Sequence, residues 1–343
     1  MPRAQDPTQS LLRWGIEHAA PGSLAQTAQE IKDGKRPDLD TGILKAMMGQ
    51  SDAEKMRECV MVIQGQWVDR DGTGQVKNNS DITPEDRYRA WEDLEMLVED
   101  LDNANDLANM GLWEPIVAHL TDSDDEVVKH ACWVCGTAVQ NNPKSQKAFL
   151  DQDPLPTVQS IVTSADASHQ TRAKAMYCLS STLKHSEPAV ERFAELDGWK
   201  TLTQTLQDPS LKLRAKTAFL LSQLATQTPS LPSFLSQLRT ASTLSTLVDS
   251  LSPSTAVPTG SSGSQETVDA DLRDKGIRFL ANVVERMPEQ GGAGGGDAEL
   301  LLTDDEKEQI RRVVEEVEAS DGWTPEDVGM LADEWAAFKR QLA

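Results

Sequence analysis

Hydrophobic positions follow a helical period over most of this chain. Tyr88, Trp91, Leu94, Val98 and Leu101 recur at spacings of three and four residues, which places them on one face of a helix. Three later stretches are also apolar helices by pattern: EVVKHACWVCGTAVQNN, SHQTRAKAMYCLSSTLKHS and LKLRAKTAFLLSQLATQ. No segment alternates between apolar and polar residues strongly enough to predict a sheet. The pattern therefore predicts an all-α protein.

These helices belong to an internal repeat. Ala131, Ala173 and Ala215 follow one another at intervals of 42 residues, and Arg172-Ala173-Lys174 returns as Arg214-Ala215-Lys216. Within one period we predict two short helices, PKSQKAFLDQD and PLPTVQSIVTSA, and one long third helix, SHQTRAKAMYCLSSTLKH. Helical repeats of about this length are typical of armadillo and HEAT proteins. We predict an armadillo/HEAT-like helical solenoid of about four repeats, whose third helices line a concave face.

The flanking segments differ from the repeats in composition and divide the chain into five parts. The glycine, serine and proline of PSTAVPTGSSGSQ and GGAGGGD are typical of linkers. We predict a flexible N-terminal segment with a short apolar helix (1–40) and a helical lead-in with a polar loop (41–82), followed by the armadillo-like repeats (83–252). A linker insertion (253–267) comes next. The last part (268–343) contains a last repeat helix, a Gly-rich linker and an acidic helical cap built from EKEQIRRVVEEVE and TPEDVGMLADEWAAFKRQL.

Net charge restricts the class of partner. The 343 residues carry a formal charge of −22, which disfavours nucleic acid and anionic membrane surfaces. No apolar run approaches the ~20 residues that span a bilayer, and MPRAQDPTQS lacks the apolar stretch of a secretory signal. We expect a cytoplasmic, monomeric protein whose partner is another protein.

Two motifs suggest a metal or redox site but lack the context for one. Cys132 and Cys135 form a C-x-x-C inside a helical pattern, without a second cysteine pair, so core packing is the better interpretation. Asp69–Ser80 begins like an EF-hand calcium loop. Its twelfth position is Ser80 instead of a bidentate carboxylate, and Lys77 stands where a water-bridging ligand belongs, so a solvated loop is preferred.

Catalytic signatures are missing from the sequence. It contains no phosphate-binding glycine loop after a strand, no nucleophile elbow, and no pair of histidines at metal-ligand spacing. We therefore expect a protein that is not an enzyme and that holds no cofactor and no metal.

Asparagine is concentrated where helices meet. Asn103, Ala104 and Asn105 lie in EDLDNANDLANMGLWEPI, and Asn141 and Asn142 close the helix in GTAVQNN. Asparagine is unfavourable inside helices, because its amide competes for backbone hydrogen bonds. It is favoured at helix ends, and it is also suited to hydrogen bonding with a partner. Both interpretations stay open at this point.

Several segments together resemble a known family. They are LLRWGIEHA, LEMLVEDLDNANDLANMGLWEPI, GTAVQNNPKSQKAFL and LKLRAKTAFLLSQL. They resemble the armadillo-type nucleotide exchange factors of heat shock protein 70 chaperones, the family of fungal Fes-type and animal Hsp-binding-protein factors. The resemblance covers about residues 8–240 and leaves out the C-terminal hundred residues, and the DRDGTGQV insertion departs from the family spacing.

The resemblance implies a mechanism without bond chemistry. The concave face would bind the ATPase domain of the chaperone and promote ADP release and then client release. The partner-binding residues it suggests are Asn103, Ala104, Asn105, Asn141, Asn142, Arg172 and Arg214. The alternative for the two arginines is an ion pair between repeats, and Trp113 and Pro115 are read as core and helix start. The N-terminal segment would compete for the client site through Leu11, Leu12, Trp14 and Ile16.

Two other functions stay in competition. An armadillo-type adaptor would bind linear peptides, through regularly spaced Trp and Asn on successive third helices. Here Trp91 and Trp133 occupy two third helices, but Tyr177 and Phe219 replace tryptophan in the next two. The other alternative is a calcium-responsive helical protein built on Asp69–Ser80.

Overall fold

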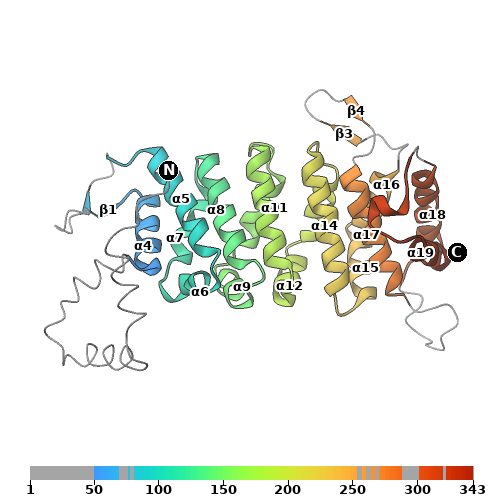
Figure 1. Cartoon of the computed structure of the whole chain (residues 1–343), viewed down its shortest axis with the longest axis horizontal. Helices are drawn as coiled ribbons and strands as arrows, with labels where there is room; N and C mark the ends of the chain where they lie inside the picture. The colour runs from blue at the N-terminus through green and yellow to red at the C-terminus, as the bar shows by residue number, and fades with distance from the viewer. Residues whose placement is uncertain are drawn as a thin grey trace, which may run out of the picture. The chain divides into compact units, whose positions relative to one another are not determined.

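The computed structural model of the chain describes residues 50–68, 76–77, 81–252, 257–259, 264–266, 270–287, 301–319 and 322–342. The chain divides into two compact units, Met1–Glu58 and Cys59–Ala343. The described helices of the second unit confirm the predicted armadillo-like architecture (Figure 1).

The long third helices pack side by side in chain order. They are α5 (Pro84–Val98), α8 (Asp125–Val139), α11 (His169–Leu183), α14 (Leu211–Gln227) and α17 (Ala270–Glu285). Each contacts the next, and the contact between α11 and α14 is much less extensive than those of α8 with α11 and of α14 with α17.

Shorter helices pack against this layer. The first helices of the repeats follow one edge of the stack in Figure 1: α6 (Leu101–Asn109), α9 (Pro143–Leu150), α12 (Glu187–Glu195) and α15 (Leu231–Thr240). The second helices are α7 (Trp113–Ala118) with the 3₁₀ turn η2 (His119–Thr121), α10 (Leu155–Thr163), α13 (Gly198–Leu206) and α16 (Thr243–Leu251). Upstream of the repeats lies α4 (Asp52–Ile63).

Capping residues explain where the helices begin. Ser168 and Ser210 precede α11 and α14, and their hydroxyls accept hydrogen bonds from the backbone N–H groups of Thr171 and Leu213. Thr83 forms a capping box at the start of α5. Pro143 occupies the first turn of α9, where a missing N–H costs no hydrogen bond. These local signals are the reason that the predicted helices agree closely with the observed ones.

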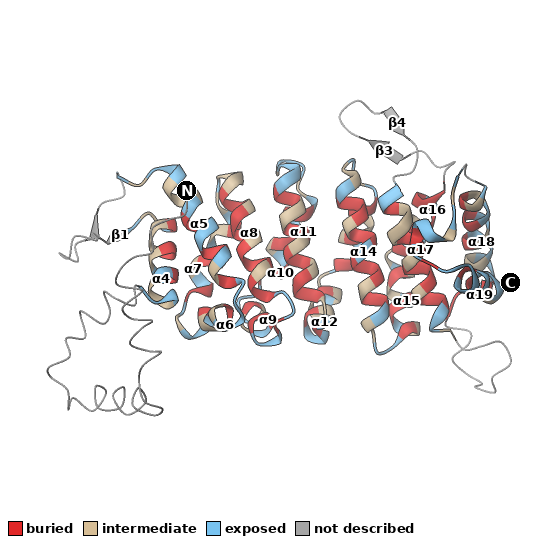
Figure 2. Ribbon diagram, viewed as in Figure 1, coloured by how far each residue is buried: buried red, intermediate tan, exposed pale blue. Residues whose placement is uncertain are grey.

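Apolar side chains fill the space between the layers, and Figure 2 shows buried residues on the inward sides of the helices. Cys59, Cys132, Cys135 and Cys178 are all buried, as the sequence predicted for Cys132 and Cys135, and burial raises the pKa of the Cys132 and Cys135 thiols well above the ordinary value. Such thiols remain protonated, so neither cysteine has the thiolate character of a redox or zinc site.

Three segments differ from the predicted structure. The polar loop and the linker insertion each contain a short antiparallel hairpin: β1 (Trp67–Val68) pairs with β2 (Val76–Lys77), and β3 (Val257–Thr259) with β4 (Ser264–Glu266). Strands of two or three residues are too short to produce a detectable alternation. The last predicted helix, 324–342, is divided into the 3₁₀ turn η4 (Pro325–Val328) and α19 (Ala332–Leu342). Gly329 adopts a φ of 64° between them, which ends the turn.

The C-terminal helices pack on the end of the repeats. Helix α18 (Asp304–Glu318) contacts α16 and α19. The Arg239 guanidinium in α15 donates hydrogen bonds to the Glu306 carboxylate in α18, at 2.6 and 2.8 Å. This two-pronged ion pair and the neighbouring apolar contacts cover the last repeat.

Candidate functional site: the third-helix face

One surface of the second unit combines aromatic rings, lysines and a polar network. We define the third-helix face as the outward side of α5, α8, α11 and α14. It carries Tyr88, Trp133, Thr137, Lys174, Tyr177, Lys216 and Phe219. Each helix of this surface packs on its neighbours through buried apolar side chains, least extensively between α11 and α14.

A row of stacked rings joins α5 and α8, and a lysine of α11 extends it. His130 stacks against Tyr88 at 5.9 Å and against Trp133 at 6.2 Å between ring centroids. The Lys174 ammonium lies 3.2 Å from the centre of the Trp133 ring, which is a close cation–π contact. Stacking and cation–π attraction thus hold side chains of three successive repeats in one arrangement.

A hydrogen-bonded network lies next to this row. The Thr137 hydroxyl donates to the Glu95 carboxylate at 2.7 Å and lies 3.4 Å from the Tyr177 hydroxyl, which in turn donates to Gln140 at 3.1 Å. Gly136 permits this arrangement, since a Cβ there would lie 2.7 Å from the Tyr177 ring. Side chains of α5, α8 and α11 are therefore coupled through polar contacts as well.

Positive charge gathers on this face although the chain as a whole is acidic. Burial lowers the pKa of Lys174 to about 8, the Glu95 carboxylate opposes this, and the charges of Lys216, Lys129 and Lys212 add to the lowering. Burial is the main cause that lowers the pKa of Lys216, and the charge of Lys212 is the next. Lys174 and Lys216 are both half-buried, so this face presents two lysines, on α11 and α14, of a chain whose net charge is −22.

Ala104 does not lie on an accessible surface, and this corrects the prediction that it faces the partner. Its side chain is only 1% exposed and is part of the buried side of α6. A methyl group at this depth cannot touch a bound protein. Its small size serves the packing of α6 against its neighbours α5, α8 and α9.

The two asparagines beside Ala104 are partly exposed. The Asn103 amide donates a hydrogen bond to the Leu97 carbonyl at 2.9 Å, so it ties α6 to the end of α5. The Asn105 side-chain oxygen is buried and accepts no hydrogen bond among the described residues. Asn103 therefore has a structural role, while Asn105 has an unused acceptor, and their role in partner binding stays a prediction.

The second asparagine pair forms a helix junction. Asn141 is exposed and adopts a φ of 52°, a left-handed conformation that asparagine tolerates better than most residues. Asn142 is buried, and its side chain accepts the backbone N–H of Ser145 as the cap of α9. The predicted partner contact by the Asn142 side chain is therefore wrong, because burial excludes it, and the helix-end interpretation applies to this residue.

The two predicted arginines point into the protein. Arg172 is 8% exposed and forms an ion pair with Asp208, which lies in the next repeat, and a 2.8 Å hydrogen bond with His169. Arg214 is 1% exposed. Both side chains are largely buried, which favours a structural role, and their contact with a partner stays a prediction. For Arg172 the structure shows the alternative interpretation, an ion pair between repeats.

The lysines of the same motif were missed by the sequence interpretation. Lys174 and Lys216 stand two positions after Arg172 and Arg214 in the repeated R-A-K. Two residues correspond to a rotation of about 200° around a helix, so the two cations of each motif point to opposite sides. The repeated motif locates both cations in the sequence. It does not tell which of the two faces outward, because that depends on the neighbouring helices.

Other predicted features lie elsewhere. Leu11, Leu12, Trp14 and Ile16 fall outside the described residues. The described residues contain no cluster of three or more metal-ligating side chains and no helix long and apolar enough to cross a membrane.

Two family models match this chain, and together they cover residues 8–239. Residues 8–107 match the model described as nucleotide exchange factor Fes1. Residues 103–239 match the SIL1/FES1/HPBP1 C-terminal domain. The second match begins in α6 and continues to the end of α15, so it contains most of the third-helix face.

Individual relatives agree with the family models. The chain is 39% identical over 230 residues to the Hsp70 nucleotide exchange factor FES1 of Mycosarcoma maydis, covering 64% of this chain and 55% of that protein. It is 33% identical over 185 residues to the protein of the same name from Gibberella zeae, covering 54% of this chain and 80% of that protein. The chain thus spans about half the length of some relatives and most of others.

Solved structures of designed armadillo repeat proteins have a fold similar to that of this chain. A designed armadillo repeat protein in complex with the peptide (KR)4 has a TM-score of 0.57 and 14% sequence identity, covering 83% of this chain and 100% of that one. A second designed armadillo repeat protein has a TM-score of 0.58 and 15% identity with the same shares. Together with the sequence matches across residues 8–239, this shows that the chain belongs to the Fes1 family of Hsp70 nucleotide exchange factors.

Proposed function

We propose that this chain is a nucleotide exchange factor for cytosolic Hsp70 chaperones, a regulator and not an enzyme. The proposal is carried by one observation: the family match from residue 8 to residue 239 contains the third-helix face. In this proposal the third-helix face binds the ATPase domain of the chaperone and promotes the release of ADP and then of the client.

The proposed binding surface differs from the one the sequence suggested. Lys174 and Lys216 replace Arg172 and Arg214 as the cationic contacts, because only the lysines lie on the outward side. Tyr177 and Phe219 lie three residues after the two lysines on the same helices, and Phe219 is 43% exposed. An exposed aromatic ring beside a cation suits a protein interface, whose core is enriched in aromatic residues. Asn103, Asn105 and Asn141 remain proposed contacts at the ends of the helices.

The proposed mechanism is a shift of populations. The ATPase domain exchanges between an ADP-closed state and an open state, and the factor accelerates release by binding the open state more tightly. A ~100-fold preference corresponds to about 2.7 kcal/mol, a modest part of the free energy of an ordinary protein interface. The stack of third helices suits this task, since a surface complementary to one state is not complementary to the other.

Binding of a basic linear peptide across the third-helix face, one form of the other candidate, is disfavoured by charge. The designed armadillo protein with a similar fold is in complex with the basic peptide (KR)4. Here Lys174 and Lys216 occupy the outward side of α11 and α14, and they would repel a basic peptide. The same lysines favour an acidic patch on the partner.

The proposal is tested by stopped-flow release of a fluorescent ADP from a cytosolic Hsp70. Micromolar protein should accelerate dye release, and the double variant Lys174→Gln/Lys216→Gln should reduce the acceleration at sub-saturating protein by about tenfold. The reduction should shrink in high salt, because exposed charges are screened there. The variant's melting temperature should stay close to that of the parent chain.

The matched control is Lys147→Gln/Lys200→Gln, which removes the same charge from exposed positions on α9 and α13. It should accelerate release as the parent chain does. No acceleration by the parent chain would refute the exchange function. Equal loss in both double variants would show that net charge matters and that the third-helix face does not.

A further inference from the structure

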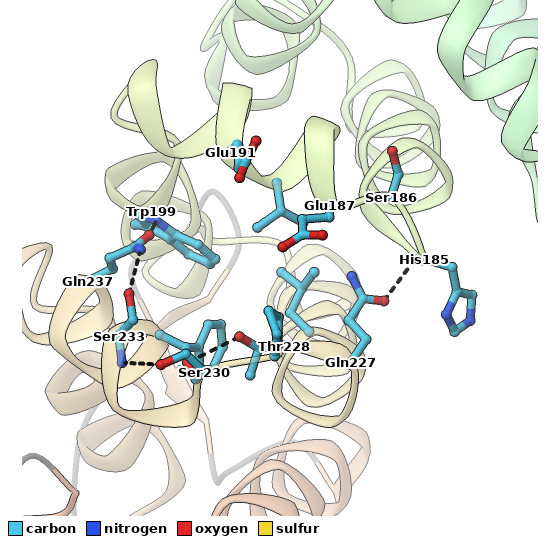
Figure 3. A pocket seen from close by; sticks show the side chains of 14 residues that line it. His185, Ser186, Glu187, Glu191, Trp199, Gln227, Thr228, Ser230, Ser233 and Gln237 are labelled. Atoms are coloured by element: carbon cyan, nitrogen blue, oxygen red, sulfur yellow. Dashed lines mark hydrogen bonds between the residues drawn. The ribbon is translucent and has the colours of Figure 1, made fainter. Parts of the chain in front are cut away.

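A cavity opens on the edge of the repeats, on a different part of the molecule from the third-helix face. It has a volume of about 500 Å³ and lies between α12 and α15, where the C-terminal end of α14 and the start of α13 meet them. Its lining also takes in His185, just past the end of α11. Figure 3 shows the side chains that line it.

The floor of this cavity is apolar. It is formed by Val190, Trp199, Leu224 and Phe234, and the Trp199 and Phe234 rings meet edge to face with centroids 5.5 Å apart. The indole N–H of Trp199 donates to Gln237 at 2.6 Å. The ring thus has no unused donor and offers the cavity only carbon. A floor of this kind favours a large apolar side chain over water.

The walls of the cavity are held in place by hydrogen bonds. Gln227 accepts the backbone N–H of His185 at 2.8 Å and donates to the Leu183 carbonyl at 2.9 Å, which joins α14 to the end of α11. Ser230 caps α15 by accepting the backbone N–H of Ser233. The polar groups here are occupied by the protein itself, so the cavity is preformed and costs a ligand little reorganisation.

Charge on the rim is of one sign. Glu187 and Glu191 lie on the α12 side, opposite Ser230 and Ser233 on the α15 side (Figure 3). The two carboxylates are exposed and four residues apart on one helix, an arrangement that destabilises a helix slightly through repulsion. Arg192, the cation of the same helix, pairs instead with Asp153 and Glu195. Among the described residues that line the cavity, none is a lysine or arginine, and His185 contributes an imidazole.

We propose that this cavity binds an extended peptide segment in which a large apolar side chain is followed directly by lysine or arginine. The apolar side chain would rest against the Trp199 and Phe234 rings, and the cation would lie near Glu187 and Glu191. Charge complementarity identifies this occupant, since an acidic segment would meet two carboxylates and no cation. The site is independent of the third-helix face and of nucleotide exchange.

The test is a titration of the full chain with capped heptapeptides, followed by the indole N–H signal of Trp199 in ¹⁵N-tryptophan-labelled protein. Gly-Ser-Phe-Arg-Lys-Ser-Gly should shift this signal with a dissociation constant in the range of 0.1 to 1 mM, roughly what a single anchor provides. Replacing phenylalanine by alanine, or Arg-Lys by Glu-Glu, should weaken binding by at least tenfold. Equal binding of all three peptides, or no shift at several millimolar, would overturn the proposal.

Two variants locate the site. Glu187→Gln/Glu191→Gln should weaken binding of the basic peptide by about tenfold, and Ser233→Trp should abolish binding by filling the cavity. The control Glu114→Gln/Glu285→Gln removes the same charge from exposed positions elsewhere. If the control weakens binding as much as the rim variant, the peptide is attracted by net charge alone and the assigned site is wrong. Unchanged binding in Ser233→Trp would also disprove it.

Discussion

The inward and outward sides of the third helices use similar residue types for opposite purposes. On the inward side, Arg172 forms an ion pair with Asp208, and Arg214 is buried. On the outward side, two positions later in the same motif, Lys174 rests on the Trp133 ring and Lys216 is half-buried. A charge in this protein therefore indicates stability or recognition only once its side of the helix is known.

The sharpest test of this contrast is an arginine placed on each side of one short helix. Ala104→Arg should destabilise the folded state by about 4 kcal/mol or more, because it forces a charge into a site that is 1% exposed. Ala108→Arg, at an exposed position of the same α6, should change stability by less than about 0.5 kcal/mol. Urea unfolding of both variants measures the difference. If the Ala104→Arg variant folds with normal stability, the assignment of Ala104 to the buried side of α6 is wrong.

The next largest effect concerns the inward cations. Arg172→Ala should cost about 3 kcal/mol, because it leaves the Asp208 carboxylate in a mostly buried site without its partner. Arg192→Ala removes an ion pair with Asp153 whose side chains are 41% and 60% exposed, so less than about 1 kcal/mol is expected. Denaturant midpoints compare the two. If both variants lose the same stability, burial does not distinguish the two pairs.

The smallest effect concerns Lys174. Burial lowers its pKa to about 8 in the folded chain from an ordinary 10.5. Between these two values the unfolded chain holds a proton that the folded lysine has released, so the folded state gains stability as pH rises from about 8 to 10.5. The gain is small, since Lys174 is only half-buried and solvent screens its charge.

Unfolding at several pH values measures this gain. The parent chain should gain stability relative to Lys174→Gln over that interval, and little below it. Lys147→Gln, at a lysine whose side chain is 78% exposed, should not show the same pH-dependent difference. A flat difference for Lys174→Gln would mean that Lys174 titrates as an ordinary surface lysine.

Much of the fold was predictable from local signals. The 42-residue repeat predicted α9 to α14 closely, and the caps and first-turn prolines seen in the structure explain why, because helix ends depend on residues within one turn. The burial of the cysteines was predictable for a similar reason, since Cys132 and Cys135 stand among apolar residues. The hairpins β1–β2 and β3–β4 were not, because strands this short leave no periodic trace.

The candidate site was predictable only in part. Among the residues that the family resemblance suggested as partner contacts, Ala104, Asn142, Arg172 and Arg214 are buried. The cavity between α12 and α15 left no sequence signal, since its residues come from three separate stretches, 185–191, Trp199 and 224–237.

The sequence by itself determined that this protein is a stack of three-helix repeats, because periodicity, caps and turns act over a few residues. Only the tertiary structure decided which cation of each R-A-K motif faces solvent and where the cavity between α12 and α15 forms. The physical reason is that a helix turns by about 100° per residue, and the neighbouring helices decide which side is covered.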